Sequence, residues 1–570
     1  MTSSSHSPTD ILRPWLPYAA VFAAVVAVYL PSLGNQAVWD DLDLVMHNEF
    51  LRSINGVVAL FTHDLWSATS KQDTSSYYRP LTMLTFALNG LLGSSAAAMR
   101  LGNVLIHALN AALFTRVVER RVGLAAAAAA LPALLWALAP VSSEPVLWIS
   151  GRFDLLALTF ALGALVTIER LSNGRLVLAG VVCLLGAFTK ESFLGWLPVL
   201  LLDAALVQRW SVRSMAKLLG AGATGAGLYL IARSQIGIPS ASFLRDLGPR
   251  VLLESEAFLV AVSVWQLLVP TRLDPFRPYA PLPWPATIAI LGTLFLGAVA
   301  LARRSASKSK PLLPSVALVG VVWFALSTLP SSLAGPVLLM TGDRYAYHPL
   351  PGLFLSATAA VAWLASRYPL SVPLKRAALL GLALLCIAAS IVNVRHFPDW
   401  HDDETLAMAS LRANPGNPYA LYSLGAQAAQ RNELERADAL LQESVQLDAR
   451  SWRTWNALCF THLRQSRLAL AESECQRSLS IHGSNARTWV NLASTFTRGN
   501  RWDAALDAAQ EAARVKPSYA EAHFLVALSA ANLGQIPLAT SHLRTGLAID
   551  PTHEGMRSLQ AQLQARGASP

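Results

Sequence analysis

Apolar stretches near the length of a membrane-spanning helix constrain this chain more than any other feature of its sequence. A helix needs about 20 mostly apolar residues to cross a bilayer, and eleven such stretches occur before residue 397. They are residues 14–33, 98–116, 122–140, 153–169, 176–189, 192–208, 216–233, 286–302, 312–330, 350–366 and 377–394. We therefore expect an all-α fold in which residues 1–397 form a polytopic bundle of about eleven spans in the lipid bilayer.

Two further apolar stretches, residues 81–92 and 250–270, differ from these spans. The first is short, and the second carries Glu254 and Glu256. We interpret both as re-entrant or interfacial segments; the alternative is that they cross the bilayer. The stretch at 14–33 is long and many spans follow it, which favours a retained first helix over a cleaved signal peptide.

The composition agrees with a membrane protein. Charged residues make up 14% of the chain, against about 25% in a typical soluble domain. The net charge of +10 comes mostly from Lys and Arg between apolar stretches, which indicates membrane orientation and no nucleic-acid partner. The four Cys show no spacing typical of a disulfide framework or metal site, and we expect Cys459 and Cys475 to be small core residues.

The positive charges predict which loops face the cytoplasm. Short cytoplasmic loops carry an excess of Lys and Arg, and with the N-terminus inside, eleven crossings place five basic clusters there. These clusters are Arg116, Arg120 and Arg121; Arg170 and Arg175; Arg209, Arg213 and Lys217; Arg303, Arg304, Lys308 and Lys310; and Arg367, Lys375 and Arg376. The loops at 34–97, 141–152, 234–285 and 331–349, and the C-terminal domain, then face outside.

A 34-residue repeat begins near residue 415, after a predicted linker at 398–414. It places four alanines in register, namely Ala437, Ala471, Ala505 and Ala539. This period is that of tetratricopeptide repeats, in which a small residue lets two helices cross closely. We predict that residues 415–570 form about four such repeats, stacked into a solenoid that binds an extended acceptor segment. The alternative is a spacer or oligomerisation module.

An acidic motif follows the first predicted span and opens an acidic loop that also holds Glu49, Asp64 and Asp73. In Trp39-Asp40-Asp41, the carboxylates can serve as general base, and Asp41 with Asp43 can bind a divalent cation, the one cofactor the sequence suggests. The alternative is a helix cap or solvated loop.

Arg79, which follows Tyr77 and Tyr78, lies at a predicted membrane edge where its guanidinium can clamp a phosphate. His107 and Asn110 lie one turn apart on one helix face. For Asn110 we favour a hydrogen bond between helices.

A third set of charged residues surrounds the predicted fourth span. Glu144, Arg152 and Asp154 flank its start, and Lys190 and Glu191 follow the fifth span. These residues are candidates for the wall of an active cavity. The alternatives are an ion pair of Arg152 with Asp154 or Glu144, and mutual neutralisation of Lys190 and Glu191.

The fourth set, Asp343, Arg344 and Tyr345, precedes the tenth predicted span. The planar fork of Arg344 suits phosphate oxygens. Tyr345 and Tyr347 suit an aromatic belt at the membrane surface, but such a belt does not account for the Asp343-Arg344 pair.

Five of these landmarks occur in an order that resembles the transmembrane and tetratricopeptide repeat-containing O-mannosyltransferases of the GT-C superfamily. They are Trp39-Asp40-Asp41, Tyr78-Arg79-Pro80-Leu81-Thr82, Gly151-Arg152-Phe153-Asp154, Thr189-Lys190-Glu191 and Asp343-Arg344-Tyr345. The resemblance implies transfer of a sugar from a polyprenyl-phosphate carrier to a protein hydroxyl on the outer or lumenal face. It implies catalytic roles for Asp40 and Asp41, and a donor-phosphate role for Arg344, with Arg79 and Arg152 as secondary candidates.

The chain departs from the family pattern where Asp343 replaces the usual Glu, and it has fewer repeats than many members. Two other functions remain open from the sequence. One is an envelope oligosaccharide polymerase or ligase, and the other is a non-enzymatic membrane scaffold that recruits proteins through its repeats. The alanine-rich composition and few Cys favour a bacterial inner membrane with the repeats in the periplasm.

Overall fold

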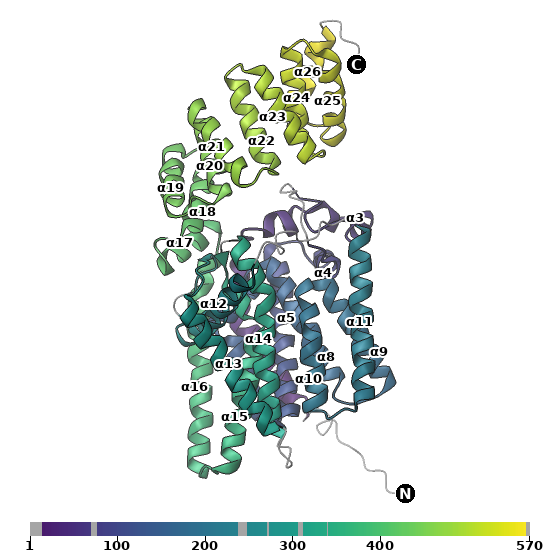
Figure 1. Ribbon diagram of the computed structural model, residues 1–570, viewed down its shortest axis with the longest axis vertical. Coiled ribbons are helices and arrows are strands. Elements are labelled where there is room, and N and C mark those ends of the chain that lie inside the picture. The colour runs from purple at the N-terminus through teal and green to yellow at the C-terminus, as the bar shows by residue number, and fades with distance from the viewer. Residues whose placement is uncertain are drawn as a thin grey trace. The chain divides into compact units, whose positions relative to one another are not determined.

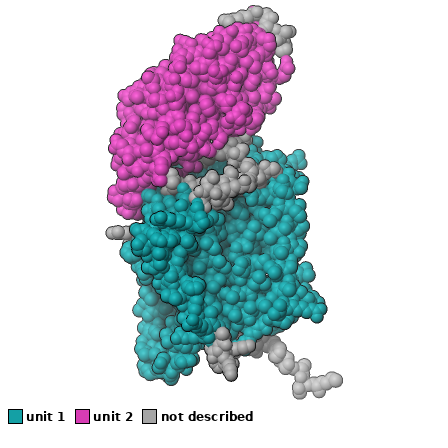
Figure 2. Space-filling model, in the orientation of Figure 1, with its two compact units in different colours: residues 1–409 teal, residues 410–570 magenta. Residues whose placement is uncertain are grey.

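A computed structural model describes residues 14–69, 77–236, 248–270, 273–305, 312–338 and 340–565. Asp73, Lys308 and Lys310 therefore lie outside the described residues. The chain divides into two compact units, residues 1–409 and 410–570 (Figure 2). We describe each unit by itself.

The first unit is a bundle of long helices that run side by side (Figure 1). Its long helices are α2 (Leu16–Tyr29), α5 (Ala96–Val118), α6 (Ala126–Leu138), α8 (Arg152–Thr167), α9 (Asn173–Thr189), α10 (Leu197–Leu206), α11 (Val212–Gln235), α12 (Pro249–Leu268), α13 (Trp284–Ser305), α14 (Leu312–Leu338), α15 (Leu350–Arg367) and α16 (Val372–His396).

Short elements connect these helices. They are η1 (Leu30–Gly34), η2 (Leu42–Met46), η3 (Glu49–Leu51), α3 (Ile54–Ala59), α4 (Pro80–Gly90), η4 (Glu119–Gly123), η5 (Pro140–Ser142), α7 (Glu144–Leu147), η6 (Ile149–Gly151), η7 (Glu191–Trp196), β1 (Arg277–Pro278), β2 (Met340–Thr341), η9 (Asp343–Ala346) and η10 (Phe397–Trp400). Strands β1 and β2 pair antiparallel, with Arg277 opposite Thr341.

Eight helices among the described residues are long and apolar enough to cross a membrane, and nine if one bent pair counts as a span. The chain is therefore a multi-pass membrane protein. Seven of the eight match predicted spans, namely those at 14–33, 98–116, 153–169, 216–233, 286–302, 312–330 and 377–394. The predicted span at 122–140 is the first arm of the pair that bends by 69°. Three other predicted spans do not meet this criterion, namely those at 176–189, 192–208 and 350–366. Helix α9 has only 17 residues and α10 only 10, and α15, which covers 350–366, is not among the eight.

Helix α12, the eighth of these helices, covers the stretch at 250–270. Its length and composition would let it cross a bilayer, which is the alternative to the re-entrant or interfacial segment that the sequence predicts. The Ser255 and Tyr279 hydroxyls lie 2.5 Å apart, and Gln266 near the other end donates to Asp343. These two contacts lie about 16 Å apart along α12. Their partners flank the same pair of strands, because Tyr279 directly follows β1 and Asp343 follows β2. Helix α4, over 81–92, has 11 residues and is too short to cross.

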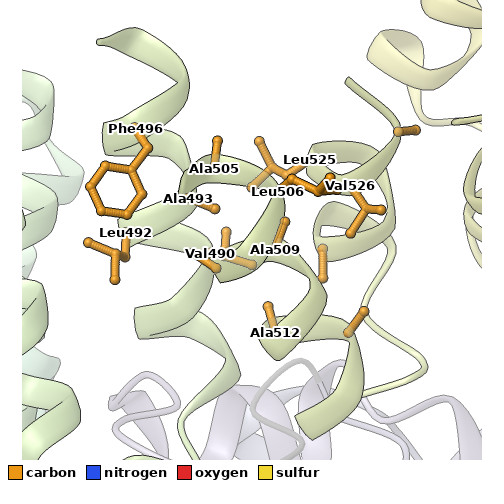
Figure 3. Packing of buried hydrophobic residues seen from close by; sticks show 14 of the residues in the cluster. Val490, Leu492, Ala493, Phe496, Ala505, Leu506, Ala509, Ala512, Leu525 and Val526 are labelled. Atoms are coloured by element: carbon orange, nitrogen blue, oxygen red, sulfur yellow. The ribbon is translucent and has the colours of Figure 1, made fainter. Parts of the chain in front are cut away.

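The second unit consists of helix pairs, which confirms the predicted repeats. The pairs are α18 (Pro418–Gln430) with α19 (Leu434–Leu447), α20 (Trp452–Arg464) with α21 (Leu468–Ile481), α22 (Ala486–Arg498) with α23 (Trp502–Val515), and α24 (Ala520–Asn532) with α25 (Ile536–Ile549). Helix α17 (Asp403–Ala413) precedes them and α26 (Glu554–Ala565) follows. The register alanines Ala437, Ala471, Ala505 and Ala539 are all fully buried, and Figure 3 shows the close packing around Ala505.

The turn inside each repeat uses one residue in the left-handed backbone region. These residues are Asn432, Ser466, Asn500 and Gly534, with φ angles of 64°, 61°, 54° and 75°. They are 34 positions apart, so the period seen in the sequence also holds for the backbone. Asn and Gly tolerate this conformation better than other residues, which explains three of the four choices.

Cys459 and Cys475 form a disulfide with a Cα–Cα distance of 5.3 Å. Both side chains are fully buried, as predicted for core residues, but the spacing of the Cys did not predict the bond between them. The 16-residue separation placed them on the facing sides of α20 and α21, where the two helices of one repeat cross. Cys183 and Cys386 are free and buried.

Candidate active site

The loops at one end of the bundle meet around the guanidinium of Arg344. Glu144 accepts a hydrogen bond from the Arg344 backbone N–H at 2.9 Å and another from its side chain. The guanidinium lies 5.1 Å from the ring centre of Trp39, 5.3 Å from that of Trp148 and 4.8 Å from that of Tyr345. Burial alone would lower the pKa of Arg344, but the Glu144 charge raises it above its usual value. Arg344 is thus a permanent cation inside an aromatic enclosure.

Asp41 ties the loop after α2 to the loop before α8. Its carboxylate is fully buried and accepts from the backbone N–H groups of Ser150 at 2.7 Å, Ile149 at 3.1 Å and Val38 at 3.2 Å. Burial raises the pKa of Asp41 to about 6, although these hydrogen bonds oppose the shift. Asp41 therefore fixes the loop geometry at the site.

Asp40, the other predicted acid, is half-buried. The preceding residue, Trp39, adopts a left-handed backbone with φ of 58°. For a bulky residue this conformation is uncommon and costs about 1–3 kcal/mol. The Trp39 ring stacks on Trp148 with centres 5.1 Å apart and contacts Phe276 edge-on. The same ring contacts the Arg344 guanidinium, so the residue that precedes Asp40 lies beside this cation.

A cavity opens beside Arg344 between α8, η7, α14 and η9. Its lining comprises Asp154, Lys190, Ser192, Gly195, Trp196, Leu326, Ser327, Ser331, Arg344, Tyr345 and His348. The Lys190 ammonium lies 2.5 Å from the Asp154 carboxylate. His348 Nε2 lies 3.0 Å from the Asp154 backbone oxygen and 3.5 Å from its carboxylate. The cavity thus collects several groups that can donate hydrogen bonds to an anion.

Lys190 and Glu191 do not neutralise each other, contrary to the suggested alternative. Lys190 pairs with Asp154, whereas Glu191 receives two hydrogen bonds from Arg79, at 2.5 and 3.0 Å. The two adjacent side chains therefore bind different partners, Lys190 a residue of α8 and Glu191 the residue just before α4. Burial would raise the pKa of Glu191, but the Arg79 charge holds it below its usual value.

Arg79 belongs to a second, smaller cavity. Its lining is Asn48, Phe50, Leu60, His63, Asp64, Leu65, Arg79, Pro80 and Met83. The guanidinium also lies over the rings of Tyr77, at 4.5 Å, and Phe153, at 4.8 Å. Because Glu191 accepts from two nitrogens of the Arg79 guanidinium, Arg79 connects the segment before α4 to η7.

Arg152 is buried, and its partners are neutral oxygens. It donates to Asn103 Oδ1 at 2.8 Å, Asn89 Oδ1 at 2.8 Å, the Met99 carbonyl at 2.6 Å and the Thr85 carbonyl at 3.2 Å. The suggested ion pair of Arg152 with Asp154 or Glu144 was wrong. The guanidinium instead connects α4, α5 and α8, which gives it a structural role.

Asp343 anchors the loop that follows α12. It accepts from the Asp274 backbone at 3.0 Å, from Arg277 at 3.4 Å and from Gln266. Burial raises the pKa of Asp343 to about 7, and the nearby charges of Glu144 and Asp274 add to the shift while Arg277 opposes it. Asp343 therefore holds the segment that carries Phe276 against Trp39.

Tyr347 does not belong to a membrane belt, because its side chain is fully buried. Its hydroxyl lies 2.8 Å from His107 Nδ1 and accepts from Asn110 at 3.2 Å. Asn110 also donates to the Leu155 carbonyl of α8 at 2.9 Å, which confirms the predicted hydrogen bond between helices. Tyr345, in contrast, lines the cavity.

Sequence reasoning missed Arg100. This residue is fully buried and donates to the carbonyls of Asn35 at 2.6 Å, Gln36 at 2.7 Å and Leu147 at 2.8 Å. An arginine inside a predicted span was the available signal, because intramembrane charges are rare and need partners. Trp148 and His348 were also not assigned, although His348 lies in the run that begins at Gly342.

The described residues hold no group of three or more His, Cys, Asp or Glu side chains arranged to bind a metal ion. Both oxygens of Asp41 accept backbone hydrogen bonds, so the suggested cation site with Asp43 lacks a ready ligand there. Asp43 is half-buried in the first turn of η2.

The fold and this site define a multi-pass membrane protein with tetratricopeptide-type repeats and a buried Arg–carboxylate–aromatic centre. No protein-family model matches the chain. The human protein O-mannosyl-transferase TMTC3 is 24% identical over 468 residues, covering 73% of this chain and 50% of that protein. A Caenorhabditis elegans protein O-mannosyl-transferase, F38B6.6, is 23% identical over 453 residues, covering 74% and 61%.

Human TMTC4 is 31% identical over 170 residues, which is 27% of this chain and 23% of TMTC4. The chain thus resembles the transmembrane and tetratricopeptide repeat-containing O-mannosyltransferases, as the sequence predicted, and its match spans about half the length of TMTC3. Among solved structures, the crystal structure of MamA has a TM-score of 0.25 and 20% identity, covering 26% of this chain and 86% of MamA.

Proposed function

We propose that this chain is a GT-C-type glycosyltransferase that moves a sugar from a polyprenyl-phosphate donor to a protein hydroxyl. The observation that supports this most is the cavity in which Arg344, Lys190 and His348 meet beside the Trp39-Asp40 loop. The names of the relatives favour mannose as the sugar.

The donor phosphate would bind in this cavity. Arg344 offers a planar fork and Lys190 a compact charge, and both suit phosphate oxygens. Glu144 and Asp154 hold these two cations in place through short ion pairs. As the bond to the sugar breaks, negative charge grows on the leaving phosphate, and fixed cations in a desolvated cavity stabilise that charge. Trp196 and Leu326 supply apolar lining for the start of the lipid chain.

Asp40 would act as general base. It would take the proton from the acceptor hydroxyl, whose oxygen then attacks the anomeric carbon while the phosphate leaves from the opposite face. One C–O bond forms and one breaks, and because the attack comes from the face opposite the leaving phosphate, the configuration at the anomeric carbon inverts. Asp41 does not exchange the proton in this scheme, because three backbone N–H groups hold its carboxylate. It positions Asp40 instead.

We further propose that site and repeats lie on the outer face of the membrane, which is the periplasm in a bacterial inner membrane. The disulfide between Cys459 and Cys475 supports this location, because disulfides persist in oxidising compartments and are rare in the cytosol. On this proposal, the basic cluster that contains Arg116 and Arg121 lies on the opposite, cytoplasmic side of the membrane. The repeats would hold an extended segment of the acceptor protein.

The test uses the purified full-length chain in lipid nanodiscs with polyprenyl-phosphate mannose and an envelope-protein extract as acceptor. Arg344→Gln should lower hexose transfer by about 100-fold or more, whereas Arg250→Gln, which changes an arginine that is 71% exposed, should not. Equal transfer by both variants would overturn the proposal. Added blocks of several sugars would favour a polymerase or ligase, and absence of donor binding would favour a scaffold.

A further inference from the structure

The chain segment that follows the last helix of the bundle is bound to the loop that carries Asp40. Asn35 Nδ2 donates to the Phe397 carbonyl at 2.8 Å, and the Gln36 N–H donates to the His401 carbonyl at 2.8 Å. The Trp39 N–H donates to the Asp403 carboxylate at 2.6 Å. Three hydrogen bonds therefore connect residues 35–39 to residues 397–403, some 360 positions later in the sequence.

Aromatic packing supports the same connection. The Phe397 ring stacks on Tyr29 at the end of α2, with ring centres 5.4 Å apart and planes at 29°. Phe397 and Trp400 are both buried. The segment at 397–403 is thus part of the packed structure that surrounds the acidic loop.

The hydrogen bond from Trp39 to Asp403 differs from the other two because its donor, Trp39, has a left-handed backbone conformation. Trp39 is the only residue among those described in the first 200 positions, apart from glycines, with a positive φ. A left-handed backbone at a bulky residue persists only when the surroundings impose it. Here the ring is held by Trp148, Phe276 and Arg344, and the amide is held by Asp403.

We propose that Asp403 is a positioning residue for the transferase reaction, acting through the backbone of Trp39 on the placement of Asp40. This inference rests on the proposed function. The carboxylate accepts the Trp39 N–H and thereby keeps Asp40 directed as the general base needs. Asp403, the first residue of α17, is on this view a component of the proposed active site.

The test compares Asp403→Ala, which removes the acceptor oxygen, with Asp403→Asn, which keeps one. The matched control is Asp402→Ala, because Asp402 caps the start of α17 by accepting from the Thr405 N–H at 2.8 Å. That control removes an adjacent carboxylate and loosens the same helix without removing the acceptor of Trp39. All variants are full-length chains in nanodiscs.

We expect Asp403→Ala to lower the turnover number about tenfold or more with little change in the KM for donor, since small misplacement of a catalytic group is costly. Asp403→Asn and Asp402→Ala should stay within about threefold of the unmodified chain. A loss of the same size in Asp403→Ala and Asp402→Ala, following a common loss of thermal stability, would overturn the proposal, as would unchanged turnover in Asp403→Ala.

Amide hydrogen exchange provides a readout that does not depend on transfer. Peptides covering residues 35–41 should exchange about tenfold faster in Asp403→Ala than in Asp402→Ala, because the Trp39 amide loses its acceptor. Equal exchange in these two variants contradicts the positioning role. If the unmodified chain transfers no sugar, the proposed function fails, while the exchange result still decides whether Asp403 holds the loop.

Discussion

Within each of the two units of this protein, the helices are held together by a different kind of residue. In the repeats, small apolar side chains such as Ala471 and Ala505 are fully buried between the helices. In the bundle, several of the largest fully buried side chains are arginines, namely Arg100, Arg121 and Arg152. Each of these arginines connects separate segments through hydrogen bonds.

This difference predicts which kind of substitution most reduces the stability of each unit. A repeat interface tolerates few changes in side-chain volume, because its helices are already in close contact. The bundle depends on matched polar partners, because an unpaired charge away from water is costly. The bundle should therefore respond most to changes of charge, and the repeats to changes of size.

The largest effect is expected from breaking a buried ion pair of the bundle. Arg121 donates to Asp203 through two nitrogens, at 2.8 and 3.0 Å, and both side chains are 2% exposed. Arg121→Met leaves Asp203 unpaired and should destabilise the bundle by about 3–5 kcal/mol. Thermal unfolding in detergent measures the loss. Adding Asp203→Leu should restore most of it, and a double variant as unstable as the single one would contradict this reading.

The disulfide of the repeats should give the next effect. Replacing Cys459 and Cys475 by Ala should lower the free energy of unfolding of residues 410–570 by about 2–4 kcal/mol. Denaturant titration of the two proteins provides the measurement. The unmodified unit in a reducing agent should behave like the variant, and no difference between reduced and oxidised protein would show that the bond adds no stability.

The third-largest loss of stability is expected from enlarging a buried, uncharged side chain in the repeats. Ala505→Leu adds volume at a fully buried crossing and should cost about 1–3 kcal/mol. The control is Ala504→Leu at the neighbouring, partly buried position, which should cost less. If the bundle variant Ala108→Leu, also fully buried, costs as much, the effect reports general core packing and not a feature of the repeats.

The smallest effect concerns a charged group in the repeats. His462 lies 2.7 Å from Glu474 and 3.2 Å from Asp438 of the preceding repeat, and the hydrogen bond to Glu474 raises its pKa. A raised histidine pKa contributes stability that is fully present below the unfolded-state value of about 6.5 and is lost as pH rises through the folded-state value. The melting temperature of residues 410–570 should therefore fall from pH 6 to pH 8.5, and less in His462→Gln.

The repeats were predictable from the sequence because one residue type recurs at one spacing. Ala437 and its three equivalents fix both the period and the crossing point of each helix pair, so local pattern and tertiary contact coincide. The disulfide was missed because the pairing of Cys459 with Cys475 requires knowing how two helices face each other. Their spacing alone does not show it.

The site was predictable only as a set of motifs. The charges of Asp41, Arg152, Lys190 and Arg344 indicated which segments form the site. They did not indicate the partners of these residues, because the partners are distant in sequence or are backbone groups. Arg152 bonds to amide and carbonyl oxygens on two other helices, and Asp41 to amides more than 100 positions away. The connection of Asp403 to Trp39 left no trace in the sequence.

One measurement tests most directly whether the loop that carries Asp40 and the side chain of Arg344 act on one donor. It is the rate of hexose transfer by Asp40→Asn in nanodiscs, together with equilibrium binding of polyprenyl-phosphate mannose to the same variant. The account predicts donor binding equal to that of the unmodified chain and transfer slowed about 100-fold or more, because a general base contributes that much. Unchanged transfer by Asp40→Asn would contradict it.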